Sequence, residues 1–336
     1  MAKTKIEEKQ RIIVTGGLGF IGSNFLTYMS NKYKNYRFIN VDSLTYSGNI
    51  NNLKSLEGKE NYEFIKEDIG NFNGMLSLIQ EGDIIVNFAA ESHVDNSIKD
   101  PGIFIRTNVL GTHSLLEVAR MKKASLFVQV STDEVYGSLG FDQESSKETD
   151  ILIPSSPYSA SKAAAELICL SNFRTFRQNV MITRSSNNFG PYQFPEKVIP
   201  LFVTNLIEGK KVPLYGSGKN VRDWLYVLDN CKALDFIIHN GDIGEIYNIG
   251  GGNELQNIEL TSKILSALGK DNKFIEHVED RLGHDLRYSI NCDKLKALGW
   301  KPEFDFESAL KQTVEWYTRN KEWWLPLKKT PGKRTS

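Results

Sequence analysis

Two short motifs in the middle of the sequence carry side chains suited to proton transfer. Tyr158 and Lys162 stand four residues apart in the stretch 156–176, whose alanine-rich composition predicts a helix, so they share one helical face. An ammonium group beside a phenol favours the phenolate, which would let Tyr158 act as a base near neutral pH. This spacing also occurs on ordinary amphipathic helices, and on the pattern alone that interpretation is preferred.

The second motif, at 131–137, reads Ser-Thr-Asp-Glu-Val-Tyr-Gly and directly follows an apolar run at 126–130 that is typical of a buried strand. Adjacent Asp133 and Glu134 at the carboxyl end of a strand can lie in different environments. One can then stay protonated and act as an acid while the other is ionised and acts as a base. The alternative is an exposed acidic turn, which is common for an Asp-Glu pair.

A glycine-rich segment near the N-terminus indicates a dinucleotide site. Gly16, Gly19 and Gly22 recur at every third position between a short β-rich run and a helical pattern. Glycines there permit a tight turn and let backbone N–H groups approach a pyrophosphate. Asp42 ends the next predicted strand, and a carboxylate at that place accepts hydrogen bonds from ribose hydroxyls and repels a 2′-phosphate. No Arg or Lys immediately follows Asp42, so the sequence favours NAD over NADP.

The elements that must hold these motifs alternate between strand and helix through the first 190 residues. β-rich runs are expected at 11–15, 36–42, 62–65, 83–88, 126–130 and 180–184, with helical stretches at about 21–31, 74–80, 101–120 and 156–176. This alternation predicts an α/β fold with a doubly wound parallel sheet, the Rossmann arrangement, covered by helices on both faces.

Prolines interrupt this rhythm after about residue 190, which suggests a second, smaller α/β domain for substrate binding. A strand is expected at 212–215 and a helix at 257–268. We expect an NAD-binding domain over 10–190 with a return segment at about 224–250, a substrate domain over 191–223 and 251–325, and a polar tail over 326–336.

Composition narrows the class of protein. The 336 residues include 41 Lys plus Arg and 41 Asp plus Glu, which makes no electrostatic case for binding nucleic acid or an anionic membrane. No segment approaches the roughly 18 apolar residues of a membrane span, and the charged N-terminus does not resemble a signal peptide. Three widely spaced cysteines lack metal-ligand spacing and fit a reducing compartment. We therefore expect a cytoplasmic enzyme with no metal site, no nucleic-acid partner and no membrane partner.

Eight segments in order along nearly the whole chain resemble the extended short-chain dehydrogenase/reductase family, and within it the dTDP-glucose 4,6-dehydratases. They are 15–22, 89–95, 131–137, 158–162, 184–192, 194–200, 222–227 and 280–285. The Thr132-Asp133-Glu134 trio discriminates within the family, because sugar epimerases lack the Asp-Glu pair and related decarboxylases and GDP-mannose dehydratases usually lack the Asp. Leu18, Asn96 and Leu282 depart from the common pattern, and the last two leave the nucleotide or sugar preference open.

The resemblance implies a mechanism in which NAD is regenerated at each turn. Tyr158 would take the proton of the sugar 4-hydroxyl while carbon 4 gives hydride to NAD, with Thr132 and Lys162 in support. Glu134 would then remove the hydrogen on carbon 5, and Asp133 would protonate the departing 6-hydroxyl before hydride returns to carbon 6. The product would be a 4-keto-6-deoxy sugar nucleotide.

The same resemblance implies the ligand contacts and the assembly. For NAD they are Gly16, Gly19, Phe20, Ile21, Gly22, Asp42, Ser43, Leu44, Thr45, Asp68, Ile69, Ala89, Ala90, Ser92, Thr107, Tyr158, Lys162 and Asn188. For dTDP-glucose they are Ser92, Thr132, Asp133, Glu134, Asn187, Lys197, Val198, Pro213, Leu214, Tyr215, Arg222, Asn257, Arg281 and His284. A homodimer would pair the helices near 103–120 and 158–176. The alternatives are a 4-epimerase or decarboxylase of the same family, or a non-catalytic NAD-binding protein.

Overall fold

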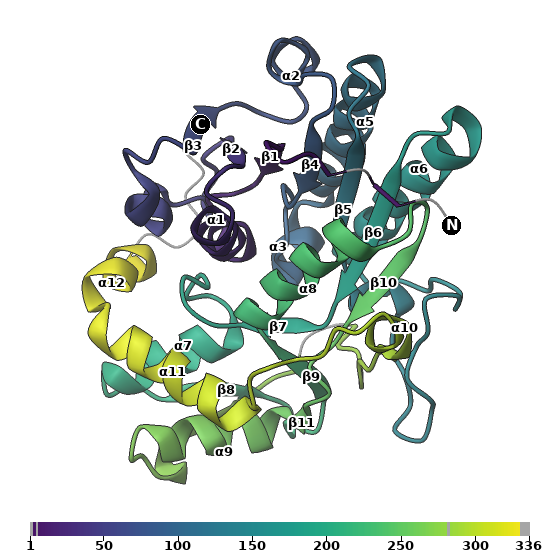
Figure 1. Ribbon diagram of the computed structural model, residues 1–336. Helices are drawn as coiled ribbons and strands as arrows, with labels where there is room; N and C mark the ends of the chain where they lie inside the picture. The colour runs from purple at the N-terminus through teal and green to yellow at the C-terminus, as the bar shows by residue number, and fades with distance from the viewer. Residues whose placement is uncertain (1–2, 5, 281–282, 330–336) are drawn as a thin grey trace.

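A seven-stranded parallel sheet, in the order β10-β6-β5-β4-β1-β2-β3, forms the larger part of the molecule (Figure 1). Its strands are β1 (Arg11–Thr15), β2 (Arg37–Asp42), β3 (Tyr62–Lys66), β4 (Ile84–Asn87), β5 (Leu126–Thr132), β6 (Val180–Ser185) and β10 (Ile246–Ile249). The computed structural model describes residues 3–4, 6–280 and 283–329. The first six strands follow the order of a doubly wound nucleotide-binding sheet, which reverses direction between β1 and β4 and places a ligand crevice there.

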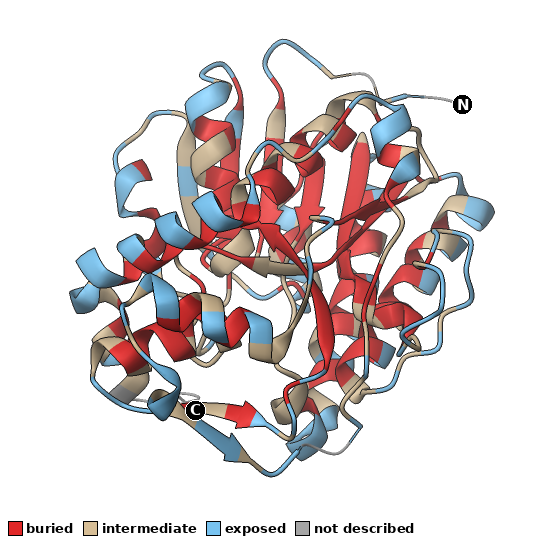
Figure 2. Cartoon of the chain, turned by 90° about the horizontal axis from the view of Figure 1, so that it is seen from below, coloured by how far each residue is buried: buried red, intermediate tan, exposed pale blue. Residues whose placement is uncertain are grey.

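Helices cover both faces of this sheet, which is why its strands read as nearly continuous apolar runs. On one face lie α1 (Phe20–Lys32) and α8 (Val227–Asn240), and on the other lie α2 (Phe72–Leu78), α5 (Thr112–Met121) and α6 (Pro157–Phe176). Alternate residues of β1 enter the two cores: Ile12 and Val14 join the first, and Ile13 joins the second. Figure 2 shows the strands buried between helices whose outer faces are exposed.

The region from 101 to 121 is not one continuous α-helix. It consists of α4 (Pro101–Phe104), a π-helical segment η2 (Ile105–Gly111) and α5, preceded by α3 (Val94–Lys99). In η2 the small Gly111 faces Ile69, and a Cβ on this glycine would approach the Ile69 Cδ1 to 2.9 Å. The turns η1 (Ile50–Leu56) and η3 (Asp133–Tyr136) complete the first 190 residues. Single-turn π segments are frequent at functional sites, and η2 carries Thr107.

The remaining elements gather at one end of the molecule, below the main sheet in Figure 1. They are β7 (Asn187–Phe189), α7 (Val198–Ile207), β8 (Val212–Tyr215), β9 (Val221–Tyr226), β11 (Glu254–Gln256), α9 (Asn257–Ala267), η4 (Asn272–Phe274), β12 (Ile275–Val278), α10 (Asp293–Ala297) and α11 (Phe306–Arg319). Strands β11, β9 and β7 form one small sheet, and β12 and β8 form another. Between them the chain returns through α8 to β10, which pairs with β6. This arrangement supports the proposed division into a cofactor domain with a return segment and a substrate domain.

The C-terminal end differs from the expected tail. Residues 326–329 continue helix α12 (Lys321–Lys329), which contains Pro326. Trp324 is completely buried, and Lys328 donates hydrogen bonds to Asn205 and Glu208 of the α7 region. These contacts hold a segment whose polar and proline-containing sequence predicts no helix. Across the described ranges, every helix is too short or too polar to cross a membrane.

Candidate active site

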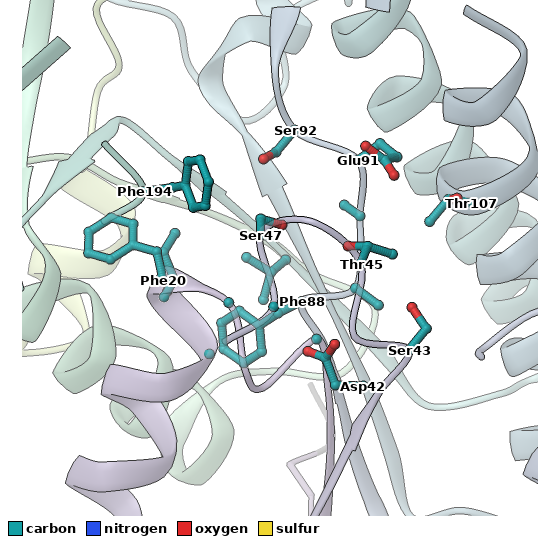
Figure 3. A pocket seen from close by; sticks show the side chains of 18 of the residues that line it. Phe20, Asp42, Ser43, Thr45, Ser47, Phe88, Glu91, Ser92, Thr107 and Phe194 are labelled. Atoms are coloured by element: carbon teal, nitrogen blue, oxygen red, sulfur yellow. The ribbon is translucent and has the colours of Figure 1, made fainter. Parts of the chain in front are cut away.

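A cavity with about 290 Å³ of open space lies at the carboxyl ends of β1, β2, β4 and β5 (Figure 3). Among the residues predicted to contact NAD, those that line it are Gly16, Gly19, Phe20, Ile21, Gly22, Asp42, Ser43, Thr45, Asp68, Ile69, Ala89, Ala90, Ser92, Thr107, Tyr158 and Lys162. Leu44 and Asn188 lie outside this lining. In Figure 3, Phe20 and Phe194 stand on one side, Ser43, Thr45 and Thr107 on the other, and Glu91 and Ser92 at one end.

The glycine-rich turn is packed too tightly for side chains. Gly16 has a φ of +68°, and a Cβ there would lie 2.6 Å from the Ala89 backbone nitrogen. A Cβ on Gly22 would lie 2.5 Å from the Gly16 carbonyl oxygen. The turn therefore presents bare backbone and the start of α1 to the cavity, which suits an anionic pyrophosphate.

Asp42 is oriented by backbone donors at the bottom of the cavity. Its Oδ2 accepts a hydrogen bond from the Leu18 N–H at 2.9 Å, and its Oδ1 accepts one from the Leu44 N–H at 2.8 Å. Leu44, which has a positive φ of 56°, thus contributes to the site through its backbone N–H. Each carboxylate oxygen keeps a lone pair for another donor, such as a ribose hydroxyl. Asp68 is exposed and accepts the Gly70 N–H, which is the ordinary arrangement of a loop acid.

Tyr158 and Lys162 project from the first turns of α6 into the cavity wall. Ser156 caps this helix in a reciprocal pair with Ser159, and Pro157 occupies its first position, so the sequence fixes where the helix begins. The Lys162 Nζ donates a hydrogen bond to the Val130 carbonyl oxygen at 2.6 Å. Burial lowers the pKa of Lys162 to about 8.

The pKa of Tyr158 does not fall, contrary to the prediction made from Lys162 alone. The pKa of Tyr158 is raised, because the phenol is buried and the negative charge of Glu134 lies nearby, and these effects outweigh a side-chain hydrogen bond with Thr132. The lysine is engaged with the Val130 carbonyl. A ligand with positive charge in the cavity would shift this balance toward the phenolate.

Asp133 lies in an environment that favours its protonated form. It is 3% exposed, and the Thr132 Oγ1 lies 3.3 Å from its Oδ1. Burial, followed by the charges of Glu134 and Asp223, raises the pKa of Asp133 well above its ordinary value, while Arg222 opposes the shift. Glu134 is half-buried, and its backbone N–H donates to the Thr132 Oγ1. The two acids therefore lie in different environments, and Asp133 is shielded from bulk solvent.

A buried ion pair connects the helix of Tyr158 to the turn of Asp133. The Arg184 Nη2 lies 2.7 Å from the Glu166 Oε2, one helical turn beyond Lys162. The Arg184 Nη1 donates to the Tyr136 hydroxyl at 2.7 Å, and this hydroxyl donates to the Asn248 Oδ1 at 2.8 Å. Thus α6, η3, β6 and β10 meet in one network. The sequence pattern did not predict this network, although Arg184 opens one of the eight family segments.

The residues predicted to contact the sugar nucleotide are spread over a longer path. Ser92 and Lys197 line the cavity, where the Lys197 Nζ donates to the Ser92 carbonyl oxygen at 2.9 Å. Arg222 is buried near Asp133, with its guanidinium 4.2 Å from the ring centroid of Tyr288. Tyr288, which was not predicted, also lies close to Glu134.

Other predicted contacts lie outside the cavity lining, on the smaller sheets and helices. Asn187 is in β7, Val198 begins α7, Asn257 begins α9, and Pro213, Leu214 and Tyr215 are in β8. Leu214 is buried, whereas Tyr215 is exposed and meets His284 edge to face at 6.1 Å. Arg281 and Leu282 lie outside the described residues.

Several cavity residues were not predicted. They include Ser47, Glu91, Ile103, Tyr192, Gln193, Phe194 and Glu196. The Tyr46 hydroxyl donates to the Glu196 Oε1 at 3.0 Å, and its ring meets Phe194 edge to face at 5.6 Å. Phe194 and Glu196 belong to the family segment 194–200, beside the predicted contact Lys197. Their closeness to Lys197 in the sequence could have identified them as cavity residues.

Comparison with known proteins adds a family and solved relatives. The family model described as GDP-mannose 4,6 dehydratase matches residues 13–313. The low-salt glycan biosynthesis protein Agl12 of Haloferax volcanii is 48% identical over 93% of this chain and 99% of its own length. A dTDP-glucose 4,6-dehydratase of Streptomyces niveus is 45% identical over 95% of this chain and 96% of its own.

Solved structures agree closely in fold. The dTDP-glucose 4,6-dehydratase DesIV of Streptomyces venezuelae, with NAD bound, matches at a TM-score of 0.92 and 46% identity, covering 95% of this chain and 100% of its own. A UDP-glucose 4-epimerase of Thermotoga maritima matches at a TM-score of 0.85 and 29% identity, covering 92% of this chain and 99% of its own. The fold alone is thus shared by dehydratases and epimerases.

Proposed function

The chain belongs to the GDP-mannose 4,6-dehydratase family, and from this membership we propose that it is an NAD-dependent hydro-lyase that converts dTDP-glucose to dTDP-4-dehydro-6-deoxy-glucose and water. The observation that carries the proposal is the buried Asp133 beside Glu134, both close to the phenol of Tyr158. An elimination needs an acid for the leaving hydroxyl and a base for the adjacent carbon, and these two carboxyls differ in the required sense. The relatives named dTDP-glucose 4,6-dehydratase support the same substrate.

The lining of the cavity fits NAD in its chemistry. The bare glycine turn suits the pyrophosphate, and the half-satisfied Asp42 suits ribose hydroxyls. Tyr158 and Lys162 stand at the end of the cavity that adjoins β5. When bound, NAD supplies a hydride acceptor for carbon 4 and a hydride donor for carbon 6.

The chain's own residues divide the proton transfers among them. We assign to Tyr158 the proton of the 4-hydroxyl, with Thr132 at hydrogen-bond distance of that phenol and Lys162 beside it. Once carbon 4 is a ketone, the hydrogen on carbon 5 is acidic, and Glu134 removes it. Asp133, whose pKa burial raises, gives its proton to the departing 6-hydroxyl, so that water leaves neutral.

The mass of the product tests this function. The purified protein is incubated separately with dTDP-glucose, UDP-glucose and CDP-glucose, and products are weighed by mass spectrometry. Loss of one water, fastest from dTDP-glucose, is the expected result. None of the alternatives would give this loss of mass. An epimerase would give a product of unchanged mass, a decarboxylase acts on a uronic acid and would leave these three substrates unaltered, and so would a non-catalytic NAD-binding protein.

We also propose a homodimer, formed through the outer faces of η2, α5 and α6. Leu110 and Leu167 are 56% and 59% exposed there, and Ile105, Met121 and Phe176 are also exposed. Large apolar side chains gathered on one helical face are typical of an interface. Replacing Leu167 with Glu should shift the molecular mass measured by light scattering from two chains toward one, whereas Ile50→Glu, at an exposed site on η1, should leave it unchanged.

The cytoplasm remains our proposed location, consistent with Cys169, Cys231 and Cys292 all being free thiols.

A further inference from the structure

Helix α12, at the far end of the chain, is connected by hydrogen bonds to the glycine-rich turn. The Trp323 Nε1 donates to the Asn52 Oδ1 at 2.8 Å, and the Asn52 Nδ2 donates to the Leu18 carbonyl oxygen at 2.9 Å. In Figure 1, α12 lies at the edge of the molecule, beside the purple N-terminal elements and next to α11. The last described helix therefore reaches the first loop of the cofactor site.

Asn52 helps to fix the backbone of the glycine turn through its hydrogen bond to Leu18. The Leu18 carbonyl oxygen also accepts the Asn49 N–H at 3.1 Å, and the Leu18 N–H donates to Asp42, so both sides of this residue's backbone are engaged. Asn52 is 2% exposed, which leaves little access for water to replace a lost partner. Because an indole N–H is only a donor, Trp323 fixes which way the Asn52 amide points. Trp323 therefore directs the Asn52 Nδ2 donor toward the Leu18 carbonyl oxygen.

The ring of Trp323 also contacts the 190–194 loop, which borders the cavity on the same side as Phe20. It meets Tyr192 at 5.8 Å and Trp316 at 5.1 Å between ring centroids. Tyr192 lines the cavity with a positive φ of 67°, a conformation that a non-glycine residue keeps only when its surroundings hold it. The neighbouring Gln193 carbonyl oxygen accepts the Tyr317 hydroxyl at 2.5 Å.

Helix α12 is itself firmly attached. Lys328 lies 2.6 Å from the Glu208 Oε2, at the end of α7. Trp324 is completely buried, and its Nε1 donates to the Tyr317 carbonyl oxygen at 2.8 Å. A helix bound in this way can resist separation of the two segments that Trp323 contacts, Asn52 and the 190–194 loop.

We propose that Trp323 is a positioning residue for the cofactor: through Asn52 and Tyr192 it holds the glycine turn and the 190–194 loop together and slows the release of bound NAD. The inference rests on the proposed function only in taking NAD as the ligand. It does not depend on the sugar substrate or on the proton-transfer residues.

The test compares Trp323→Phe with a matched control, Trp324→Phe. Both changes remove an indole N–H that donates at 2.8 Å from the same helix, but only Trp323 leads to the glycine turn. Holoprotein carrying isotope-labelled NAD is mixed with excess unlabelled NAD, and the label remaining on the protein is followed with time. We expect release to be about three- to tenfold faster for Trp323→Phe, the size of one lost hydrogen bond. The acceleration should be smaller for Trp324→Phe, which weakens the attachment of α12 but leaves the contact between Trp323 and Asn52 in place.

A second variant approaches the same link from its other end. Asn52→Ala should speed release at least as much as Trp323→Phe, and the double variant should be no faster than Asn52→Ala, because both changes break one chain of contacts. Thermal unfolding with saturating NAD checks that each variant is folded. Equal release from Trp323→Phe and the wild type, or equal acceleration by both tryptophan changes, would overturn the proposal. A wild type that binds no NAD would overturn the proposed function as well, so the two failures are distinguishable.

Discussion

The two proton-transfer motifs of the site are built on different kinds of structure. Tyr158 and Lys162 lie on α6, a 20-residue helix with a capped start and a buried ion pair to Arg184 one turn further on. Asp133 and Glu134 lie on η3, a turn of four residues. The spacing of the first pair follows from the helix itself, whereas the acid–base difference within the second arises from burial. In the proposed mechanism, oxidation at carbon 4 thus depends on residues of a long helix, and elimination depends on the environment of a short turn.

Removing the phenol tests the helical motif and should give the largest effect. Tyr158→Phe keeps the ring but removes the proton acceptor, so oxidation and every later step should slow by about 10⁴-fold, the upper end for general acid–base catalysis. Mixing the holoprotein with dTDP-glucose should then give no absorbance of reduced nicotinamide. Tyr247→Phe, a buried tyrosine in β10, is the control. Normal turnover by Tyr158→Phe would show that another group takes the 4-hydroxyl proton.

Removing Glu134, the proposed general base on η3, should separate oxidation from elimination. Glu134→Gln should leave oxidation intact and slow elimination by about 10³-fold, because an amide cannot remove the hydrogen on carbon 5. Reduced nicotinamide should therefore accumulate in a single turnover while product is absent. Glu144→Gln, at an exposed site in the following loop, should behave like the wild type. Rapid dehydration by Glu134→Gln would exclude this residue as the base.

The raised pKa of Asp133 predicts that the elimination rate depends on pH, an effect of moderate size. Burial raises its pKa, and the protonated form is the acid, so the elimination rate should fall as pH rises through that raised pKa. Asp133→Asn should be slower by about 10²-fold and should lose this alkaline decline, since an amide does not titrate there. The measurement is kcat against pH, with product followed by mass. An unchanged alkaline decline in Asp133→Asn would assign it to another group.

The smallest effect is expected from the network that joins the two motifs. Tyr136→Phe keeps the ring under Arg184 but removes the hydroxyl that accepts from Arg184 and donates to Asn248. The turn η3 should loosen while α6 keeps its Glu166 pair, so elimination should slow by about tenfold with oxidation unchanged. Single-turnover absorbance separates the two rates. Equal slowing of both would mean that Tyr136 supports α6 as much as η3.

Local pattern was sufficient for the main sheet and for the parts of the site that lie within one segment. The strands through β6, helix α6, the glycine turn and the acid pair all carry signals within about twenty residues, and the structure places Asp42 and Asp133 where those signals predict. The π segment η2 had no such signal, because its irregular hydrogen bonding has no sequence period of its own.

The missed elements depend on contacts between distant segments. Pro326 ordinarily argues against a helix, yet α12 forms because Trp324 and Lys328 find partners on α11 and α7. Glu166 and Arg184 read as ordinary charges until folding pairs them. The unexpected rise in the pKa of Tyr158 has the same origin, because it reflects burial of this α6 side chain beside Glu134 and Asp133 of η3.

The attachment of α12 to the glycine turn has a consequence for synthesis. The glycine turn is synthesised about 300 residues before Trp323, so the two partners of this contact leave the exit tunnel at very different times. The strand β10, which pairs with β6, also follows β7, β8 and β9 in the chain. Although N-terminal regions generally fold first during translation, the nucleotide fold here can reach its final form only after residues through Trp323 have been made.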